Sequence, residues 1–265
     1  MPMLEVDTTE PCLQDEVDKA LRDVVTVGVR GLTKGLESDF HSHRKAQLVL
    51  SLSGVLTCEA EGGIWIVPPQ CALWIPGALM HRMTAAGRIE SYGVFIEPKN
   101  SPPLPSTCCT VTVTPLMKEL LIRSAQFPTH YKRAGIETHV TSLLLEELSL
   151  APVGTLHLPM PKDSRLRAIF QGLMTNPAGG GTVESWARQV GASERTLARV
   201  IAAETGMSFG RWRQHLRIIL ALQWMANGAT VQQVAIDLGY ESVSSFVTMF
   251  RKTLGVSPKR YMATV

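Results

Sequence analysis

The stretch ASERTLARVIAAETGMS, residues 192–208, has a counterpart farther along the chain in VAIDLGYESVSSFVTMFRKTLGVSPKRY, residues 234–261. Equivalent positions are offset by 48 residues at first and by 49 after one insertion in the turn. The shared positions read Ala187-x3-Gly191-x-Ser193-x3-Leu197-x3-Ile201-x4-Gly206-x-Ser208 and Ala235-x3-Gly239-x2-Ser242-x3-Phe246-x3-Phe250-x4-Gly255-x-Ser257. Such self-similarity indicates two copies of one supersecondary unit.

The first copy begins with an apolar stripe on a short helix, which Gly191 can end in the left-handed conformation. Ser193 is a good N-cap for a second helix, whose Leu197, Val200 and Ile201 turn inward. The stripe consists of Val183, Trp186, Ala187 and Val190. The second helix then leaves an outer face made of Arg195, Thr196, Ala198, Arg199 and Ala202.

The second copy repeats this arrangement. Its first helix ends at Gly239, and Ser242 caps a second helix that buries Phe246, Met249 and Phe250. The apolar stripe of the first helix consists of Val231, Val234, Ala235 and Leu238. The outer face of the second helix consists of Val243, Ser244, Val247, Thr248 and Arg251.

A short helix, a glycine turn and a second helix with a small polar outer face describe a helix-turn-helix, whose second helix enters the major groove of DNA. One copy alone is equally compatible with an ordinary pair of antiparallel helices, but two copies in register favour the DNA-binding interpretation. The segment 209–225 between them is apolar almost all round, which predicts a buried strut. Two units held this way can read successive major grooves, about 34 Å apart.

Charge is distributed unevenly along the chain. Residues 1–161 carry 13 Lys and Arg against 17 Asp and Glu, whereas residues 162–265 carry 13 against 6. A basic C-terminal part attracts polyanions, nucleic acid first among them. Five cysteines without CxxC spacing indicate neither a disulfide framework nor a zinc finger. No export signal and no apolar run of membrane-spanning length is found, so we expect a cytoplasmic protein without a membrane partner.

The N-terminal half has a different pattern of apolar residues. Short apolar runs between about residues 24 and 96 are punctuated by Gly and Pro, which predicts a β sandwich or barrel. After the Pro-rich stretch 101–106, the apolar spacing predicts two amphipathic helices, and the Pro-rich segment 152–161 reads as a linker. We therefore predict an α+β protein with a sensor domain at 1–112, a helical dimerisation segment and linker at 113–161, and an all-α domain at 162–265.

Residues 182–262 resemble the DNA-binding domain of AraC/XylS-family regulators. The resemblance rests on the short motifs Gly239-Tyr240 and Gly255-Val256-Ser257-Pro258, the latter followed by Tyr261. It implies two helix-turn-helix units, joined by a long helix, that act on promoters. Family members often carry an arginine where this chain has Thr248, so the resemblance implies weaker base reading by the second unit. Arg195 and Arg199, whose side chains can pair bidentately with guanine, are then the main candidates for specificity.

The outer faces of the two second helices give the predicted DNA-binding set. It consists of Arg195, Thr196, Ala198, Arg199, Val243, Ser244, Val247, Thr248 and Arg251.

A histidine pattern marks the N-terminal half. His41 and His43 at i and i+2 put both imidazoles on one face of a strand, and Gln47 can line the same cavity. With the Pro76-Gly77 turn and His81, the pattern resembles the two cupin motifs over about residues 38–95. The resemblance implies that His41, His43, Gln47 and His81 ligate a divalent transition metal such as Zn or Ni, with Gln47 standing where a glutamate is usual.

Two interpretations of these histidines stay open. Three imidazoles and an amide oxygen can hold a transition metal, but the set lacks an anionic ligand. Alternatively, the same side chains, with Trp74, line a cavity for an organic effector, or they belong to a satisfied interior. Trp65 and Trp74 are each interpreted as core or as a ligand platform, and the Cys108-Cys109 pair as packing or as a redox switch.

The combined prediction is a regulator that senses a small-molecule effector in a cupin-like domain, pairs as a homodimer, and binds duplex promoter DNA, with RNA polymerase as a partner if it activates. No catalytic residue is assigned. One rival interpretation is a metal-dependent cupin enzyme, such as a dioxygenase or isomerase, fused to a DNA-binding tail. Another is a non-specific architectural DNA binder, whose affinity would depend steeply on salt without preferring any sequence.

Overall fold

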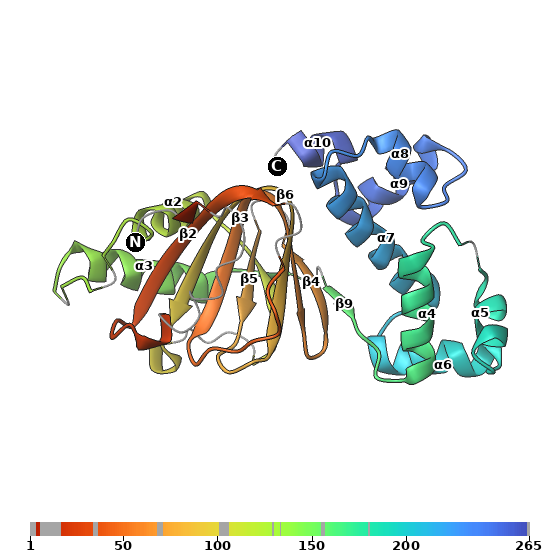
Figure 1. Cartoon of the computed structure of the whole chain (residues 1–265), viewed down its shortest axis with the longest axis horizontal. Coiled ribbons are helices and arrows are strands. Elements are labelled where there is room, and N and C mark those ends of the chain that lie inside the picture. Colours follow the sequence, from red (N-terminus) through yellow and green to blue (C-terminus); the bar gives the residue numbers. More distant parts are fainter. Residues whose placement is uncertain are drawn as a thin grey trace. The chain divides into compact units, whose positions relative to one another are not determined.

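The computed structural model describes residues 4–5, 17–33, 37–67, 71–100, 106–128, 130–132, 134–154, 157–179 and 181–263. The chain folds as two compact units (Figure 1). Unit 1 comprises residues 1–61 and 65–157, and unit 2 comprises residues 62–64 and 158–265. Unit 1 contains most of the strands and unit 2 is mainly helical, so the predicted α+β class is confirmed.

An antiparallel sheet forms the body of unit 1. Its strands follow the order β1-β2-β6-β3-β5-β7-β8, and β4 pairs with β3. Only the short β1–β2 pair is parallel among the strand pairings that can be assigned a register in the described residues. The strands are β1 (Leu4–Glu5), β2 (Val24–Thr33), β3 (Ala46–Ala60), β4 (Gly63–Val67), β5 (Cys71–Ile75), β6 (His81–Ile96), β7 (Cys109–Thr112) and β8 (Val153–Gly154), with a 3-10 turn η1 at Pro98–Asn100.

The predicted β domain is confirmed, but it differs from a closed barrel. Within the described residues the strands form an open path that begins at β1 and ends at β8. Each of these end strands is two residues long, which leaves few backbone groups to pair across a closing seam.

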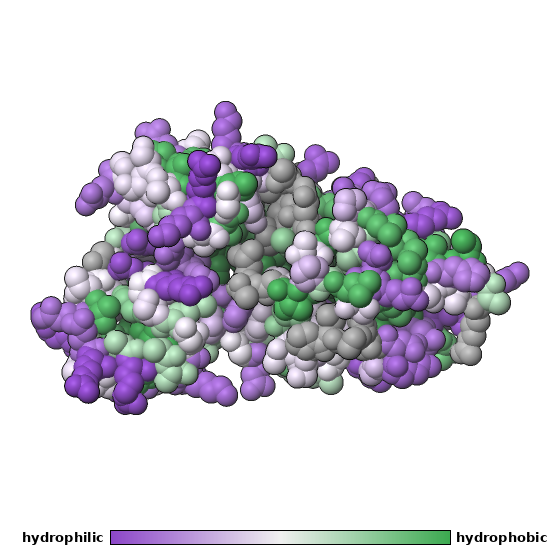
Figure 2. Space-filling view, turned by 180° about the vertical axis from the view of Figure 1, so that it is seen from behind, coloured by the Kyte–Doolittle hydropathy of each residue, from purple (hydrophilic) through white to green (hydrophobic). Residues whose placement is uncertain are grey.

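Two helices, α2 (Pro115–Ser124) and α3 (Ile136–Leu150), pack along one face of the sheet (Figure 1). Their buried side chains, among them Met117, Leu121 and Leu148, join strand residues in one apolar core. Apolar surface also remains on this unit (Figure 2). Its exposed large apolar residues include Leu116, Ile136, Leu143, Leu150 and Val153.

Unit 2 holds the two sequence copies. After β9 (His157–Pro159) come α4 (Ser164–Thr175), α5 (Val183–Gln189), α6 (Glu194–Thr205), α7 (Phe209–Ala226), α8 (Val231–Asp237), α9 (Val243–Leu254) and α10 (Pro258–Ala263). The first copy is the pair α5–α6 and the second is α8–α9. No helix of the described residues is long and apolar enough to cross a membrane.

Helix α7 is the predicted strut between the copies, and its burial is confirmed. Trp212 is 1% exposed, and its indole N–H donates to the Pro159 carbonyl at 3.0 Å. Gln214 donates to Thr253 at 2.7 Å, which ties α7 to α9. The buried residues of α7 are Phe209, Trp212, Leu216, Ile218, Ile219, Leu220, Ala221, Leu222 and Met225.

Candidate DNA interface and histidine cluster

Helix α6 is built as its sequence predicts. The Ser193 hydroxyl accepts the Thr196 N–H at 3.1 Å and caps the N-terminus, and Gly206 ends the helix with φ +67°. Leu197 and Ile201 are buried at 1% exposure each. These contacts fix which side of the helix faces water. The exposed outer face includes Arg195, Ala198, Arg199 and Ala202, while Thr196 is half-buried.

Helix α9 repeats the same construction with different side chains. The Ser242 hydroxyl accepts the Ser245 N–H, again at 3.1 Å, and Gly255 ends the helix with φ +82°. Phe246 and Phe250 are completely buried. The outward side consists of Val243, Ser244, Thr248 and Arg251, which are exposed, and Val247, which is half-buried.

The two outer faces differ in charge. Arg195 and Arg199 lie one turn apart on α6, and neither has an ion-pair partner among the described residues. At the equivalent positions α9 has Ser244 and Thr248, if the helices are aligned on their N-caps. The structure therefore brings the predicted residues to two similar surfaces of different chemistry, while their contact with DNA stays a prediction.

The turns before α6 and α9 also differ. Gly191 and Gly239 both have left-handed backbone, with φ +65° and +74°. A Cβ at Gly191 would meet no atom within 4 Å, whereas at Gly239 it would lie 2.7 Å from the Ala178 carbonyl oxygen. The second turn is therefore packed against the chain and the first is open.

In unit 1, His41, His43 and His81 form one cluster. His41 pairs with His81 through two backbone hydrogen bonds of 2.8 and 2.9 Å, and His43 precedes β3. The ring centroids are 4.4 Å apart for His41 and His81, and 5.1 Å apart for His43 and His81. One ring nitrogen of each histidine lies within 4.8 Å of those of the other two.

Hydrogen bonds determine which nitrogens are free. The Nδ1 atoms of His41, His43 and His81 lie 2.8, 2.5 and 2.8 Å from the backbone carbonyls of Asp39, Lys45 and Leu79. A carbonyl only accepts, so each Nδ1 carries the proton. The Nε2 atoms of His41 and His81 then carry lone pairs when their rings are neutral, whereas His43 Nε2 lies 3.1 Å from Gln47 Oε1.

Burial favours the neutral forms of His41 and His81. Burial lowers the pKa of His81 to about 4, and it also lowers the pKa of His41. His81 Nε2 is buried and lacks a hydrogen-bond partner within the described part of the chain. Because buried polar atoms are usually paired, this nitrogen is the one of the cluster best placed to accept from a bound molecule.

Gln47 lies beside the cluster and Trp74 does not. The Gln47 carboxamide is 3.1 Å from His43 Nε2. Gln47 is opposite Phe95 and Ile75 in the sheet, whereas Trp74 is opposite Leu48, the next residue of β3. Adjacent strand residues face opposite sides, so Trp74 lies on the other face, where it is buried in the core. Trp74 therefore does not share a site with the histidines, and its role in effector binding stays a prediction.

The surroundings of Trp65 and of the described cysteines indicate structural roles. Trp65 is 4% exposed and stacks on His157. The hydrogen bond with Cys108, together with burial, raises the pKa of the Cys58 thiol, and burial raises that of Cys109 to about 11. Thiols of this kind are poor nucleophiles, which favours packing over a redox switch for the vicinal pair. Cys12 lies outside the described residues.

Lys45 was missed by the sequence patterns. Its side chain is completely buried, and Nζ donates to the carbonyls of Ala20 and Arg22 at 2.8 and 3.0 Å. The Asp18 carboxylate accepts the Lys45 N–H at 3.1 Å. Since the Lys45 carbonyl also accepts from His43, this lysine links the chain before β2 to the cluster. A lysine between His43 and the apolar start of β3 was the available signal.

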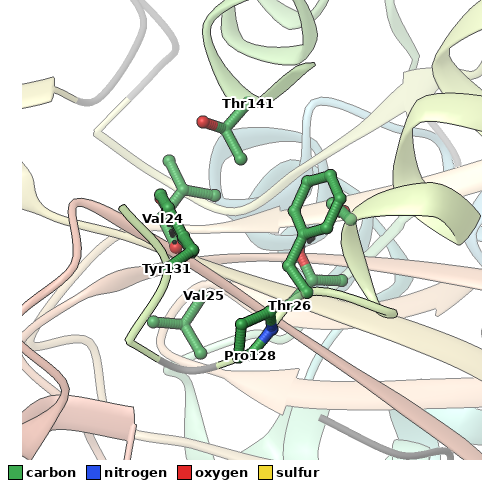
Figure 3. Close-up of a pocket in the computed structure, with 8 residues that line it drawn as sticks. Val24, Val25, Thr26, Pro128, Tyr131 and Thr141 are labelled. Carbon is green, nitrogen blue, oxygen red and sulfur yellow. Dashed lines mark hydrogen bonds between the residues drawn. The ribbon is translucent and has the colours of Figure 1, made fainter. Parts of the chain in front are cut away.

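A small hollow lies between β2 and the helices (Figure 3). Thr26 and Ser124 share a hydrogen bond of 2.8 Å, and the Tyr131 hydroxyl donates to the Val24 carbonyl. The hollow is no larger than a single water molecule, and its hydroxyls are already satisfied. It is too small for an organic effector.

Comparison with known proteins gives consistent results. A helix-turn-helix domain family matches residues 186–264. The chain is 40% identical over 248 residues to the HTH-type transcriptional regulator NimR of Escherichia coli (strain K12), which covers 94% of this chain and 90% of NimR. It is 25% identical to the virulence regulon transcriptional activator VirF of Yersinia enterocolitica serotype O:8, over 72% of each chain. ToxT from Vibrio cholerae aligns in structure with a TM-score of 0.40 and 13% identity, over 92% of this chain and 99% of ToxT.

Proposed function

This chain belongs to the AraC/XylS family of transcription regulators, and we propose that α6 and α9 are the two helices with which it reads promoter DNA. It is a DNA-binding regulator rather than an enzyme. The observation that carries the proposal is the pair of equally capped helices, each with a buried inner face and a free outer face. By analogy with VirF, which is named a transcriptional activator, the sense of regulation proposed is activation, with RNA polymerase as a partner in the cytoplasm.

Direct reading of guanine is assigned to α6. Arg195 and Arg199 are unpaired within the described residues, so no ion pair must be broken before they reach a base. Arginine offers two parallel N–H groups to O6 and N7 of guanine. Thr196 and Ala198 line the same helix, and Arg251 at the far end of α9 is suited to phosphate.

The test is selection from genomic DNA. Full-length protein is mixed with sheared DNA of its own organism, and the retained fragments are sequenced. A short set of intergenic fragments, retained at salt concentrations that remove bulk DNA, supports the proposal. Uniform retention of all fragments would instead identify a non-specific architectural binder.

The sensor site is assigned to the histidine cluster of unit 1. A small-molecule effector is proposed to bind beside His41, His43, His81 and Gln47. Three clustered imidazoles, one of them with a buried Nε2 that lacks a partner among the described residues, suit a ligand that offers a metal or hydrogen-bond donors.

The finer proposal is that His41, His43 and His81 hold a divalent transition metal, Zn or Ni, with Gln47 as a further ligand. A histidine whose Nδ1 donates to a carbonyl is oriented as metal-bound histidines usually are. Ligand nitrogens around zinc lie about 3.4 Å apart, so small side-chain rotations from the observed spread of 4.8 Å would close the site. The metal would supply a Lewis acid to which an effector atom can bind.

Elemental analysis tests the metal. Protein purified without a histidine tag or chelator should hold Zn or Ni sub-stoichiometrically, because an all-neutral ligand set offers no negative charge to offset a dication. His41→Ala and His81→Ala should each abolish it, and Gln47→Glu should tighten it, because a carboxylate is a stronger ligand than an amide. If no metal is retained by the wild type or by Gln47→Glu, the cluster binds the effector directly.

A homodimer is proposed through α3. Ile136, Leu143 and Leu150 are 60, 40 and 79% exposed and recur every seven residues along the helix. Residues at this spacing lie along one side of a helix, so they form an exposed apolar stripe that can pack against the same stripe of a second chain. Leu143→Glu should therefore convert a dimer to a monomer in sedimentation experiments, and a wild-type monomer would contradict the assignment.

A further inference from the structure

The outer face of α9 differs in chemistry from that of α6. When α6 and α9 are aligned on Ser193 and Ser242, every outward position of α6 has an equivalent on α9. The equivalent of Glu194 is Val243, and that of Ala198 is Val247. The two guanidinium groups of α6 are replaced by the hydroxyls of Ser244 and Thr248. The first two turns of α9 are thus uncharged.

The two valines lie outside the fully buried inner face of α9, with Val243 exposed and Val247 half-buried. Val243 is 37% exposed, and the inner face of the helix is already filled by the fully buried Phe246 and Phe250. Val243 and Val247 are four residues apart, so they lie one above the other on the helix surface. Valine is also a weaker helix former than alanine, so helix stability does not explain the choice.

Their location matches the part of a recognition helix that meets DNA. The N-terminal residues of the second helix of a helix-turn-helix contact the base edges in the major groove. Among the groups that bases present there, the C5-methyl of thymine is the apolar one. Serine and threonine hydroxyls can bond to any base, so Ser244 and Thr248 do not by themselves select one.

We propose that α9 selects thymine through contacts of Val243 and Val247 with C5-methyl groups, while α6 selects guanine through its arginines. This inference rests on the proposed function, since it assumes that α9 enters the major groove. It gives the operator two halves of different composition, one centred on guanine and the other on thymine. Arg251, two turns beyond Val243 on the same edge, then remains available for backbone phosphate.

Replacement of thymine by uracil is the direct test, because it removes the C5-methyl group and leaves base pairing unchanged. The probe is a genomic fragment retained by the full-length protein, synthesised with one thymine at a time replaced by uracil. Each contacted methyl should contribute about fourfold to the affinity, the value expected for burying one methyl-sized group. Sensitive thymines should cluster in one half of the protected sequence.

Protein variants then assign the contacts. Val247→Ala should abolish the sensitivity to uracil at one thymine, and Val243→Ala at a neighbouring one. Ile236→Ala is the matched control, because Ile236 is a 57% exposed aliphatic residue on α8 rather than α9. This variant should keep the sensitivity of the wild type.

The outcomes separate this inference from the proposed function. If no fragment is retained specifically, the DNA-reading function itself fails. If fragments are retained but no uracil weakens binding, or if the valine variants keep the full sensitivity, the function stands and thymine reading by α9 is overturned.

Discussion

The helix pairs α5–α6 and α8–α9 have the same backbone construction but expose different side chains. Each second helix has 12 residues, a serine cap that accepts an N–H at 3.1 Å, and a left-handed glycine at its end. Arginines lie on the outer face of one helix, and valines and hydroxyls on that of the other. Caps and buried positions therefore fix the helix, and the outer positions are free to specify different bases.

The interiors differ as well. The second copy contains a chain of aromatic contacts in which Tyr240, Phe246, Phe250 and Tyr261 follow one another with ring centroids 5.5 to 5.8 Å apart. The first copy has aliphatic side chains, Leu197 and Ile201, at the positions equivalent to Phe246 and Phe250. The interior of the second copy is therefore the more aromatic of the two.

The largest expected effect on stability comes from a substitution in α7, the helix that joins the two copies. Trp212→Ala removes a buried indole of α7 that contacts Phe170 and Phe209 and donates to Pro159. We expect a loss of about 3 to 5 kcal/mol in the free energy of unfolding of unit 2. Urea denaturation followed by far-ultraviolet circular dichroism measures it. The exposed Arg211→Ala serves as control, and equal curves for both variants would refute the strut.

The next largest effect on stability distinguishes the turn before α9 from the turn before α6. Gly239→Ala places a Cβ against the Ala178 carbonyl in addition to the left-handed strain, so we expect a loss of about 2 to 4 kcal/mol. Gly191→Ala meets open space and should lose about 1 kcal/mol, the strain alone. The same denaturation experiment compares them. Equal losses would show that the second turn relaxes freely.

A smaller effect is expected on the affinity for DNA. Arg195→Ala and Arg199→Ala should each weaken binding to a retained genomic fragment by about 1 to 3 kcal/mol, with little change for random duplex. Ser244→Ala and Thr248→Ala, at the equivalent positions of α9, should lose about 1 kcal/mol or less, as expected for single neutral hydrogen bonds. Gel-shift titrations at fixed salt decide it. Equal arginine effects on both DNAs would mean contact with phosphate only.

Much of unit 2 is predictable from sequence because its signals are local. The caps Ser193 and Ser242, and the apolar spacing around Leu197 and Phe246, act within one or two turns of helix. The position of Gly239 against Ala178 is not predictable, because the two residues are 61 positions apart and meet only in the folded chain.

Unit 1 is less predictable because sheet register decides which side chains meet. The His-x-His pattern and His81 predict a cluster, and the structure brings the three together. The strand register also places Trp74 opposite Leu48, the residue after Gln47, so its side chain lies on the other face of the sheet from the histidines. The spacing of residues in the sequence does not show this register. The burial of Lys45 depends on carbonyls of Ala20 and Arg22, contributed by a different segment.

Hydroxyl-radical footprinting of a retained genomic fragment is the most direct test of the central claim that both copies dock in DNA. Two reading helices joined by α7 should protect two tracts on one face of the duplex, about 10 base pairs apart from centre to centre. Arg199→Ala should weaken protection mainly in one tract and Val247→Ala in the other. A single protected tract in the wild type, lost equally in both variants, would contradict the account.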